Sequence, residues 1–539
     1  MKKLLSVLII TSIFSCQRKL QVDSIVIHAN VYTVDKTFDK AEAFAVKDGK
    51  FIEVGTIKEI QDTYSSDNVI DAKGRAIVPG LIDAHCHFLN LGIVSREVNL
   101  TGTTSFDEVV NRIIDFSNTH HPRYVKGRGW DQNDWEVKEF PDNRLLNKLY
   151  PDTPIAITRI DGHAILCNQA ALELGHVTVD SKIDGGEVVV KNGHLTGVLV
   201  DNAESLVMDH WPKPSHSEIA KALLVAQKQC VDLGLTTVDD AGLSKEEIEI
   251  IDSLQKSGDL KIRIYAMASG SKSNLDYYLN KGVYKTDRLD VRSFKFYADG
   301  ALGSRGALLR KPYTDKPDSY GLPVMSYETI MSGAKRIANS EFQMNTHAIG
   351  DSANHLVLKV YKEALQGLAD RRWRVEHAQV VSPEDFKYFD DIIPSIQPTH
   401  ATSDMYWAED RLGPERIKGA YAYKDLLNVN GRVALGTDFP VEEVSPFLTF
   451  YAAVSRQDLN HYPKDGFQME NALTREETLK GMTIWAAYAN FEEMEKGSIE
   501  GGKFADFVIL DKDIMQVPIE EVPKIKVVKT FINGVTVYD

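Results

Sequence analysis

The chain has 539 residues, of which 43% are hydrophobic and 26% are charged, so it is an ordinary globular sequence that is long enough to bury a large core. Its formal net charge of -15 at pH 7 argues against nucleic acid or an anionic membrane surface as a partner. The sequence carries no low-complexity tract, heptad run or internal repeat.

The first 16 residues predict an export signal. A positively charged start (residues 1–3) precedes a short apolar run (residues 4–14), which is well below the roughly 20 residues of a membrane-spanning helix. Residues 13–16 resemble a bacterial lipobox in which Cys16 becomes the lipidated first residue; the alternative is ordinary cleavage with Cys16 incidental. We expect an exported lipoprotein, anchored to a membrane and facing the periplasm of a Gram-negative-type bacterium, because no acidic run follows Cys16.

Both ends of the remaining chain alternate apolar and polar residues. Residues 51–54 and 507–510 are examples of this period of two, which is typical of half-buried strands. We therefore expect residues 22–77 and 490–539 to form one small β-sandwich.

Residues 78–489 predict an α/β fold, a (β/α)8 TIM-like barrel. Apolar, β-branched runs bounded by Gly, Pro or Asp recur at the spacing of strands that alternate with helices. The eight expected strands are Leu81 to His85, Leu235 to Asp239, Ile262 to Met267, Phe294 to Tyr297, Met344 to His347, Trp373 to His377, Ile392 to Ile396 and Val433 to Thr437. A long insertion, about residues 98–215, follows the first strand.

His85 and His87 end the first predicted strand. Side chains alternate along a strand, so both histidines should point the same way and could bind one metal ion. Cys86 should face away from the metal as a core thiol; with Cys167 and Cys230 it shows no paired spacing, so we expect no disulfide framework.

Four further side chains stand at or just past the ends of other strands, where the active sites of such barrels lie. Imidazole and carboxylate ligands suit zinc, with manganese or iron as the alternatives. Core packing is the other interpretation of the two histidines, and a helix N-cap is the other interpretation of the aspartate. The four residues are Lys295, His347, His377 and Asp438.

These motifs resemble the metal-dependent amidohydrolase superfamily, which includes urease, dihydroorotase and imidazolonepropionase, and within it the branch of N-substituted formamide deformylase. The resemblance covers nearly the whole mature chain. Its motifs are VPGLIDAHCHF from Val78, GRGWDQNDW from Gly127, DGHAILCN from Asp161, FKFYADGALGSR from Phe294, THAIGD from Thr346, RVEHAQ from Arg374, GTDFPV from Gly436 and GKFADFVILD from Gly502.

The resemblance implies roles for Asp438 and Lys295. Asp438 would be both a metal ligand and the general base that takes a proton from water. Lys295, which is costly to bury as a cation, would be carboxylated by CO2 and bridge two metals, one held by His85 and His87 and the other by His347 and His377. The alternative is a single metal, with Lys295 paired to a carboxylate such as Asp299.

Six residues are candidates for substrate binding. The tryptophan of the insertion could instead pack it against the barrel, Asp299 could cap a turn, and Arg305 could pair with Asp299. The candidates are Trp130, Asp131 and His163 in the insertion, and Asp299, Arg305 and His400 in the barrel.

The predicted function is hydrolysis of a non-peptide carbon–nitrogen bond, such as an N-formyl or N-acyl amide, by metal-activated water. Alternatives with the same site are a cyclic amide, amidine or lactone hydrolase, or a deaminase. An alternative of another class is a non-catalytic lipoprotein that binds a metal or small ligand. A Ser-His-Asp hydrolase is excluded, since no G-x-S-x-G motif occurs. The expected partners are a small-molecule substrate and, through Cys16, a membrane; homo-oligomerisation stays open.

Overall fold

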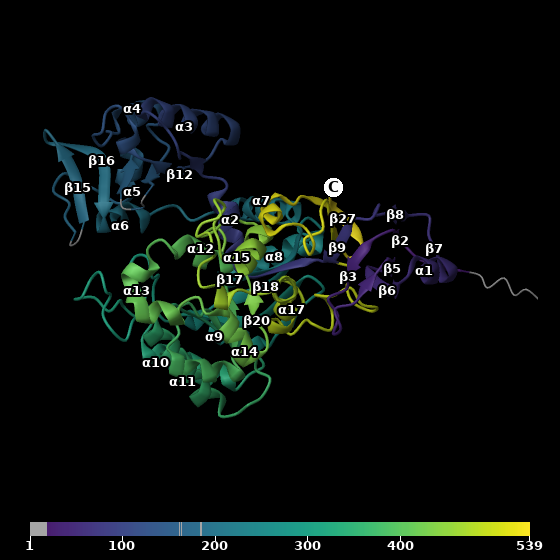
Figure 1. Cartoon of the computed structure of the whole chain (residues 1–539). Coiled ribbons are helices and arrows are strands. Elements are labelled where there is room, and N and C mark those ends of the chain that lie inside the picture. The colour runs from purple at the N-terminus through teal and green to yellow at the C-terminus, as the bar shows by residue number, and fades with distance from the viewer. Residues whose placement is uncertain (1–18, 161, 163, 184–185) are drawn as a thin grey trace, which may run out of the picture. The chain divides into compact units, whose positions relative to one another are not determined.

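The computed structural model describes residues 19–539 except 161, 163, 184 and 185 (Figure 1). The expected lipidation site Cys16 and the expected substrate residue His163 therefore lie outside the described residues. The chain divides into two compact units, one of Met1–Phe88 with Gln227–Asp539 and one of Leu89–Ala226. Within the described part of the chain, every helix is too short or too polar to cross a membrane.

The first unit contains a parallel barrel of eight strands, which confirms the predicted fold class. Each strand overlaps one of the predicted runs, and strands that are neighbours in this order pair with each other. The strands are β10 (Leu81–Cys86), β17 (Leu235–Leu243), β18 (Arg263–Ser269), β20 (Leu289–Tyr297), β21 (Gln343–Ala348), β22 (Arg374–His377), β23 (Ile393–Ile396) and β24 (Ala434–Leu435). A short strand, β19 (Tyr284–Lys285), pairs with β20 in the antiparallel direction.

Two backbone hydrogen bonds join the segments that follow the first and last barrel strands. The Asp438 amide donates to the His85 carbonyl at 2.8 Å, and the His87 amide donates to the Phe439 carbonyl at 2.8 Å. These bonds bring residues that are about 350 positions apart in the sequence to the carboxyl end of the barrel, where active sites of this fold lie.

Helices follow most barrel strands, as the βα repeat predicts. Local sequence sets their ends: α8 begins with a capping box between Ser244 and Glu247 and ends at Gly258 with φ +84°. The helices of this part are α8 (Lys245–Ser257), α9 (Lys272–Lys281), α10 (Tyr327–Ala338), α11 (Asp351–Leu365), α12 (Pro398–Asp404), α13 (Ala408–Arg416), α14 (Tyr423–Asn430), α15 (Pro446–Ser455), α16 (Arg475–Gly481) and α17 (Ile484–Ala489).

Two sheets of the first unit lie outside the barrel, and one of them combines strands from the two ends of the chain. In one, β9 (Ala76–Pro79) pairs antiparallel with β25 (Phe507–Leu510), and the order is β27-β26-β25-β9-β3-β4; in the other the order is β6-β5-β2-β8. Aromatic rings fill the core, with Phe507 stacked on Phe531 at 4.2 Å between ring centroids. The other strands are β2 (Ser24–Ile27), β3 (Asn30–Tyr32), β4 (Lys40–Ala41), β5 (Ala43–Lys47), β6 (Lys50–Gly55), β8 (Val69–Asp71), β26 (Val527–Ile532) and β27 (Val535–Tyr538).

The second unit is built on a six-stranded sheet of order β11-β12-β13-β14-β16-β15. Its helix α3 (Phe106–His120) places apolar side chains against the core of the sheet. The strands are β11 (Val98–Asn99), β12 (Val125–Trp130), β13 (Ile155–Arg159), β14 (Ala164–Cys167), β15 (Gly186–Lys191) and β16 (His194–Asp201).

The prediction that Trp130 lines a substrate pocket is wrong, because this side chain belongs to the hydrophobic core of the second unit. Trp130 is fully buried, its Nε1 donates to the Ile157 carbonyl at 2.9 Å, and its ring lies 6.0 Å from that of Trp135. The packing is within the second unit, however, and not against the barrel as the alternative proposed. Asp131 forms an ion pair with Arg159 at 2.6 Å in the same unit.

Candidate metal centre

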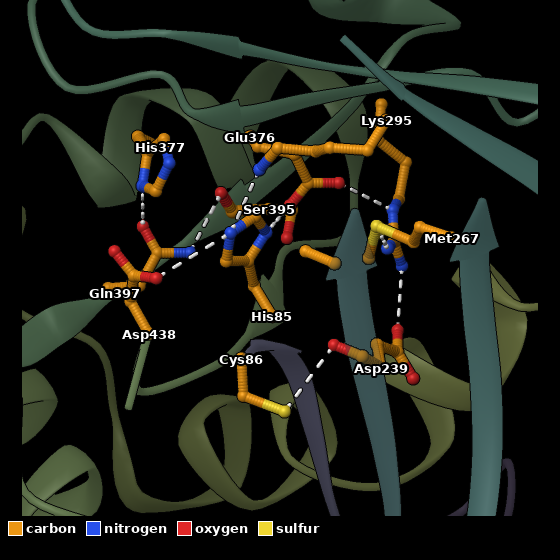
Figure 2. Close-up of polar contacts among 12 residues, drawn as sticks. His85, Cys86, Asp239, Met267, Lys295, Glu376, His377, Ser395, Gln397 and Asp438 are labelled. Atoms are coloured by element: carbon orange, nitrogen blue, oxygen red, sulfur yellow. Dashed lines mark hydrogen bonds and ion pairs between the residues drawn. The ribbon is translucent and has the colours of Figure 1, made fainter. Parts of the chain in front are cut away.

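His85 and His87 stand at the end of β10, and both Nε2 atoms approach one carboxylate. Asp438 Oδ1 lies 3.7 Å from His85 Nε2 and 3.2 Å from His87 Nε2. The donor atoms of these three side chains lie close enough together to hold one ion. Cys86 points to the other side, where its thiol donates to the Asp239 carbonyl (Figure 2).

A second group of donors shares Asp438 and consists of His377, His400 and Asp438. His377 ends β22, whereas His400 lies in the first turn of α12, with Nε2 3.7 Å from Asp438 Oδ2. The ring of His347, on β21, lies 4.5 Å from that of His377. The structure thus brings the four histidines predicted as ligands together, and adds His400 to them.

Left-handed backbone positions the last two ligands. His377 has φ 73° and Asp438 has φ 63°, and neither residue is glycine. A side chain in this region costs about 1–3 kcal/mol, and residues strained in this way cluster at active sites. This turn of the backbone at the end of β22 allows consecutive residues, Glu376 and His377, to serve the same centre.

Three residues that the sequence reasoning missed hold the rings in place. His85 Nδ1 lies 2.6 Å from Glu376 Oε2, and His377 Nδ1 lies 2.7 Å from Gln397 Oε1 (Figure 2). Both partners are oxygens that only accept, so each ring carries its proton on Nδ1 and leaves Nε2 free to bind a metal. His87 does the same through the Ala241 carbonyl at 3.1 Å.

Burial keeps the central imidazoles neutral, which is the form that binds metal. It lowers the pKa of His85 to about 4, with the nearby Lys295 adding to the effect, and lowers the pKa of His347 to about 3.

Lys295 lies at the centre of the site, on β20. It is 1% exposed and its Nζ is 3.0 Å from His85 Nε2. Burial lowers its pKa to about 8, although the nearby carboxylates of Glu376 and Asp438 favour the charged form. Among the described residues, Lys295 contacts His85, whereas Asp299 accepts from backbone amides, so the two side chains do not form the ion pair of the alternative.

Asp299 binds backbone amides, in line with its alternative role as a cap, whereas Arg305 does not pair with it. The Asp299 carboxylate accepts hydrogen bonds from the amides of Leu308, Ile349 and Gly350 at 2.8–3.0 Å, so it ties the loop after β20 to the end of β21. Arg305 pairs with Asp315 at 2.6 Å rather than with Asp299. The predicted substrate role of Arg305 is thus without support from its contacts.

The donor set fits a divalent metal. Nε2 of His347 and Nε2 of His400 are buried and have no hydrogen-bond partner in the described part of the chain. An unpartnered buried nitrogen is costly, and a metal ion would satisfy it. Imidazole and carboxylate donors suit zinc, manganese or iron. The N-cap alternative for Asp438 fails, because the next helix, α15, is capped by Ser445.

Comparison with known proteins decides the family, since the profile of the amidohydrolase family matches residues 68–538. The chain belongs to the amidohydrolase family. It is 31% identical to the protein LONG AFTER FAR-RED 3 of Arabidopsis thaliana, covering 96% of this chain and 91% of that protein. It is 24% identical to the N-substituted formamide deformylase of Arthrobacter pascens, covering 96% and 98%.

A solved structure supports the same conclusion for this amidohydrolase. An uncharacterized metal-dependent hydrolase from Pyrococcus horikoshii superposes with a TM-score of 0.78 at 27% identity, covering 92% of this chain and 99% of that one. The protein is therefore an enzyme, an amidohydrolase that acts on carbon–nitrogen bonds, and candidate His and Asp metal ligands are in place.

Proposed function

We propose that this amidohydrolase cleaves a small non-peptide amide, with N-formyl and other short N-acyl amines as the substrate class. The observation that carries the proposal is Asp438, whose carboxylate is shared by both groups of possible metal ligands. The named activity of the Arthrobacter pascens relative supports the choice of N-formyl amines. Hydrolysis of a cyclic amide, amidine or lactone, or deamination, would use the same side chains.

The four predicted histidines, Lys295 and Asp438 would hold two metal ions. When bound, such ions polarise the amide carbonyl and lower the pKa of water. Asp438 then accepts a proton from the attacking water and passes it to the leaving amine nitrogen as the carbon–nitrogen bond breaks. His85 and His377 keep their positions because Glu376 and Gln397 hold their Nδ1 atoms.

The bridging role of Lys295 depends on its neutral amine. Burial favours this form, in which the Nζ lone pair attacks CO2, a nitrogen–carbon bond forms and one proton leaves to solvent, giving a carbamate anion. With ¹³C-bicarbonate, a carbamate carbon signal should appear in the NMR spectrum of the native chain and be absent from Lys295→Ala. That variant should lose activity, with partial rescue by short carboxylic acids. Full metal content without Lys295 would contradict the bridge.

The test of the function is to express residues 17–539, count metal ions by elemental mass spectrometry, and assay N-formyl amines. We expect about two ions per chain and hydrolysis that a chelator abolishes. Asp438→Asn should lower kcat by about 10²- to 10⁴-fold while the far-ultraviolet circular dichroism spectrum, which reports the fold, stays that of the native chain. Unchanged turnover in this variant would refute the role of Asp438, and absence of bound metal would favour a non-catalytic binding protein.

We also propose that the chain is exported and lipidated at Cys16, on the strength of its N-terminal sequence alone. In a Gram-negative host, metabolic labelling with a fatty acid should mark the full chain and should fail for Cys16→Ser. Unlabelled protein released into the periplasm would support ordinary signal cleavage instead.

A further inference from the structure

A pocket of about 270 Å³ lies beside the metal centre, in the barrel unit. Its walls come from α12, from the loop that follows Asp438, from α15 and from residues 457–459. Thr399 of the lining directly precedes His400, and Glu442 follows Asp438 by four residues. Two of the lining residues are therefore close in sequence to His400 and Asp438 of the metal centre. The hydrolytic mechanism uses none of the residues that line the pocket.

Three carboxylates line this pocket without a basic partner. Glu442 accepts a hydrogen bond from the Ser403 hydroxyl at 2.6 Å. Asp458 accepts from the Tyr406 hydroxyl, from the backbone amides of Asn460 and Tyr462, and from the Asn460 side-chain amide. The Glu443 side chain is exposed and makes no hydrogen bond or ion pair within the described residues. No lysine or arginine of the described chain pairs with any of the three, so the pocket presents uncompensated negative charge.

A buried hydroxyl in the same pocket also needs a partner. Thr399 is 8% exposed, and its Oγ1 has no hydrogen-bond partner in the part of the chain that the structure describes. Leaving a buried polar group unpaired costs about 1–3 kcal/mol. A ligand with a hydrogen-bond donor would satisfy both this oxygen and the nearby carboxylates.

The remaining lining combines the polar side chains of Thr402, Ser403 and Gln457 with apolar and aromatic ones. Leu448 and Ala452 of α15 contribute hydrocarbon surface, and the exposed ring of Tyr406 stacks on Tyr462 with 5.5 Å between centroids. An aromatic face attracts an organic cation and also packs against its alkyl groups. None of the three carboxylates belongs to a group of described side chains that could hold a metal ion. The pocket therefore favours an extended organic cation over a metal ion.

We propose that this pocket binds an ammonium group on the amine half of the substrate, so that the preferred substrates are amides of cationic amines. The inference rests on the proposed function, because it describes one end of the molecule whose amide bond lies at the metal centre. The net charge of -15 supports it, since a strongly acidic protein raises the local concentration of cations.

The test uses the metal-loaded chain and two formamides of equal length, mono-N-formyl-1,5-diaminopentane and N-formylhexylamine, which exchange an ammonium for a methyl group. We expect kcat/KM to favour the cationic substrate by about tenfold or more, mainly through KM. Glu443→Gln and Asp458→Asn should each remove most of this preference and leave the neutral substrate unaffected. Glu341→Gln, an exposed carboxylate before β21, is the matched control and should keep it.

A binding measurement separates this inference from the proposed function. Calorimetry should detect n-hexylammonium but not 1-hexanol, with the heat lost in Glu443→Gln and retained in Glu341→Gln. If neither formamide is hydrolysed while hexylammonium still binds in this pattern, the proposed function fails and the cation pocket stands. If the neutral formamide is hydrolysed equally well and hexylammonium does not bind, the cation pocket is refuted and the proposed function stands.

Discussion

The Nδ1 atom of His85 lies 2.6 Å from a carboxylate oxygen of Glu376, and both side chains are inaccessible to solvent. Glu376 also accepts from Arg374 Nε at 2.9 Å, and Arg374 contacts Asp239 at 2.9 Å. Arg374 and His85 together hold the pKa of Glu376 well below its usual range, against the effect of burial. The buried ion pairs of Asp239, Arg374 and Glu376 thus orient His85 through the ring nitrogen that faces away from the metal site.

Replacing Glu376 with Gln should weaken this orientation while keeping the shape of the side chain. We expect metal affinity to fall by about 10- to 100-fold, because the imidazole loses its charged partner. Stability should fall by about 3–5 kcal/mol, because Arg374 keeps its buried charge but loses one of its two carboxylates. Chelator competition measures the first quantity and denaturant unfolding of the metal-free chain measures the second.

Asp239→Asn is the matched control for this prediction. It removes the other carboxylate of Arg374 without touching His85, so it should cost similar stability but much less metal affinity. Equal losses of metal affinity in both variants would contradict a positioning role for Glu376.

Either His347 or His400 could complete the set of metal ligands around His377. The His347 ring lies 4.5 Å from the ring of His377, whereas the His400 ring is stacked 5.9 Å away. We expect His347→Asn to lose one metal ion per chain, and His400→Asn to keep both ions but raise KM for the formamide. Elemental mass spectrometry and steady-state kinetics give the answer. The reverse pattern would assign the second ion to His377, His400 and Asp438.

The sequence predicted the features that depend on local patterns of apolar and polar residues. Apolar runs of strand length located the eight barrel strands, and the alternation of side chains placed His85 and His87 together. Glu376 and Gln397 could not be found in this way, because their role depends on partners far away in the chain. Their positions offered a signal, since Glu376 directly precedes His377, and Gln397 follows β23 as the N-cap residue of the helix that contains His400.

The sequence also could not predict which side chains pair with each other in the loops. Arg305 had Asp299 as its nearest acidic residue, but three backbone amides occupy that carboxylate, and Arg305 pairs with Asp315 instead. Trp130 stands among polar residues in its motif, which suggested a binding surface, although its ring enters a hydrophobic core formed by other strands.

Asp290 makes stability depend on pH at a distance from the metal ligands. Burial raises its pKa to about 7, with the negative charge of Glu492 adding to the effect, and neither carboxylate oxygen has a hydrogen-bond partner within the described residues. Lys285 Nζ, 3.5 Å away, compensates only in part. Because the pKa is raised on folding, the folded chain binds the proton more tightly, and stability falls as the pH rises from about 4 to about 7.

Asp290→Asn should remove this dependence. The variant should gain stability relative to the native chain at pH 8, by on the order of 4 kcal/mol at most, and the gain should shrink as the pH falls toward 5. Urea unfolding at the two pH values measures the difference. Asp287→Asn, an exposed carboxylate on the same segment, should show the same stability difference at both. A gain for Asp290→Asn that is independent of pH would contradict titration of this group.

Replacing Trp130 tests whether its side chain packs in the core of the second unit or contacts substrate. Since its ring is fully buried against Trp135 and Val125 in one cluster, Trp130→Ala should destabilise the second unit by about 3–5 kcal/mol. Hydrogen exchange should show faster opening of residues 98–201, while the metal content of the barrel stays at the native value. Phe140→Ala, which removes a half-exposed ring at 6.3 Å from that of Trp130, is the control and should cost much less. If Trp130→Ala instead raised KM and left hydrogen exchange unchanged, this tryptophan would contact substrate, and the core assignment would have to be abandoned.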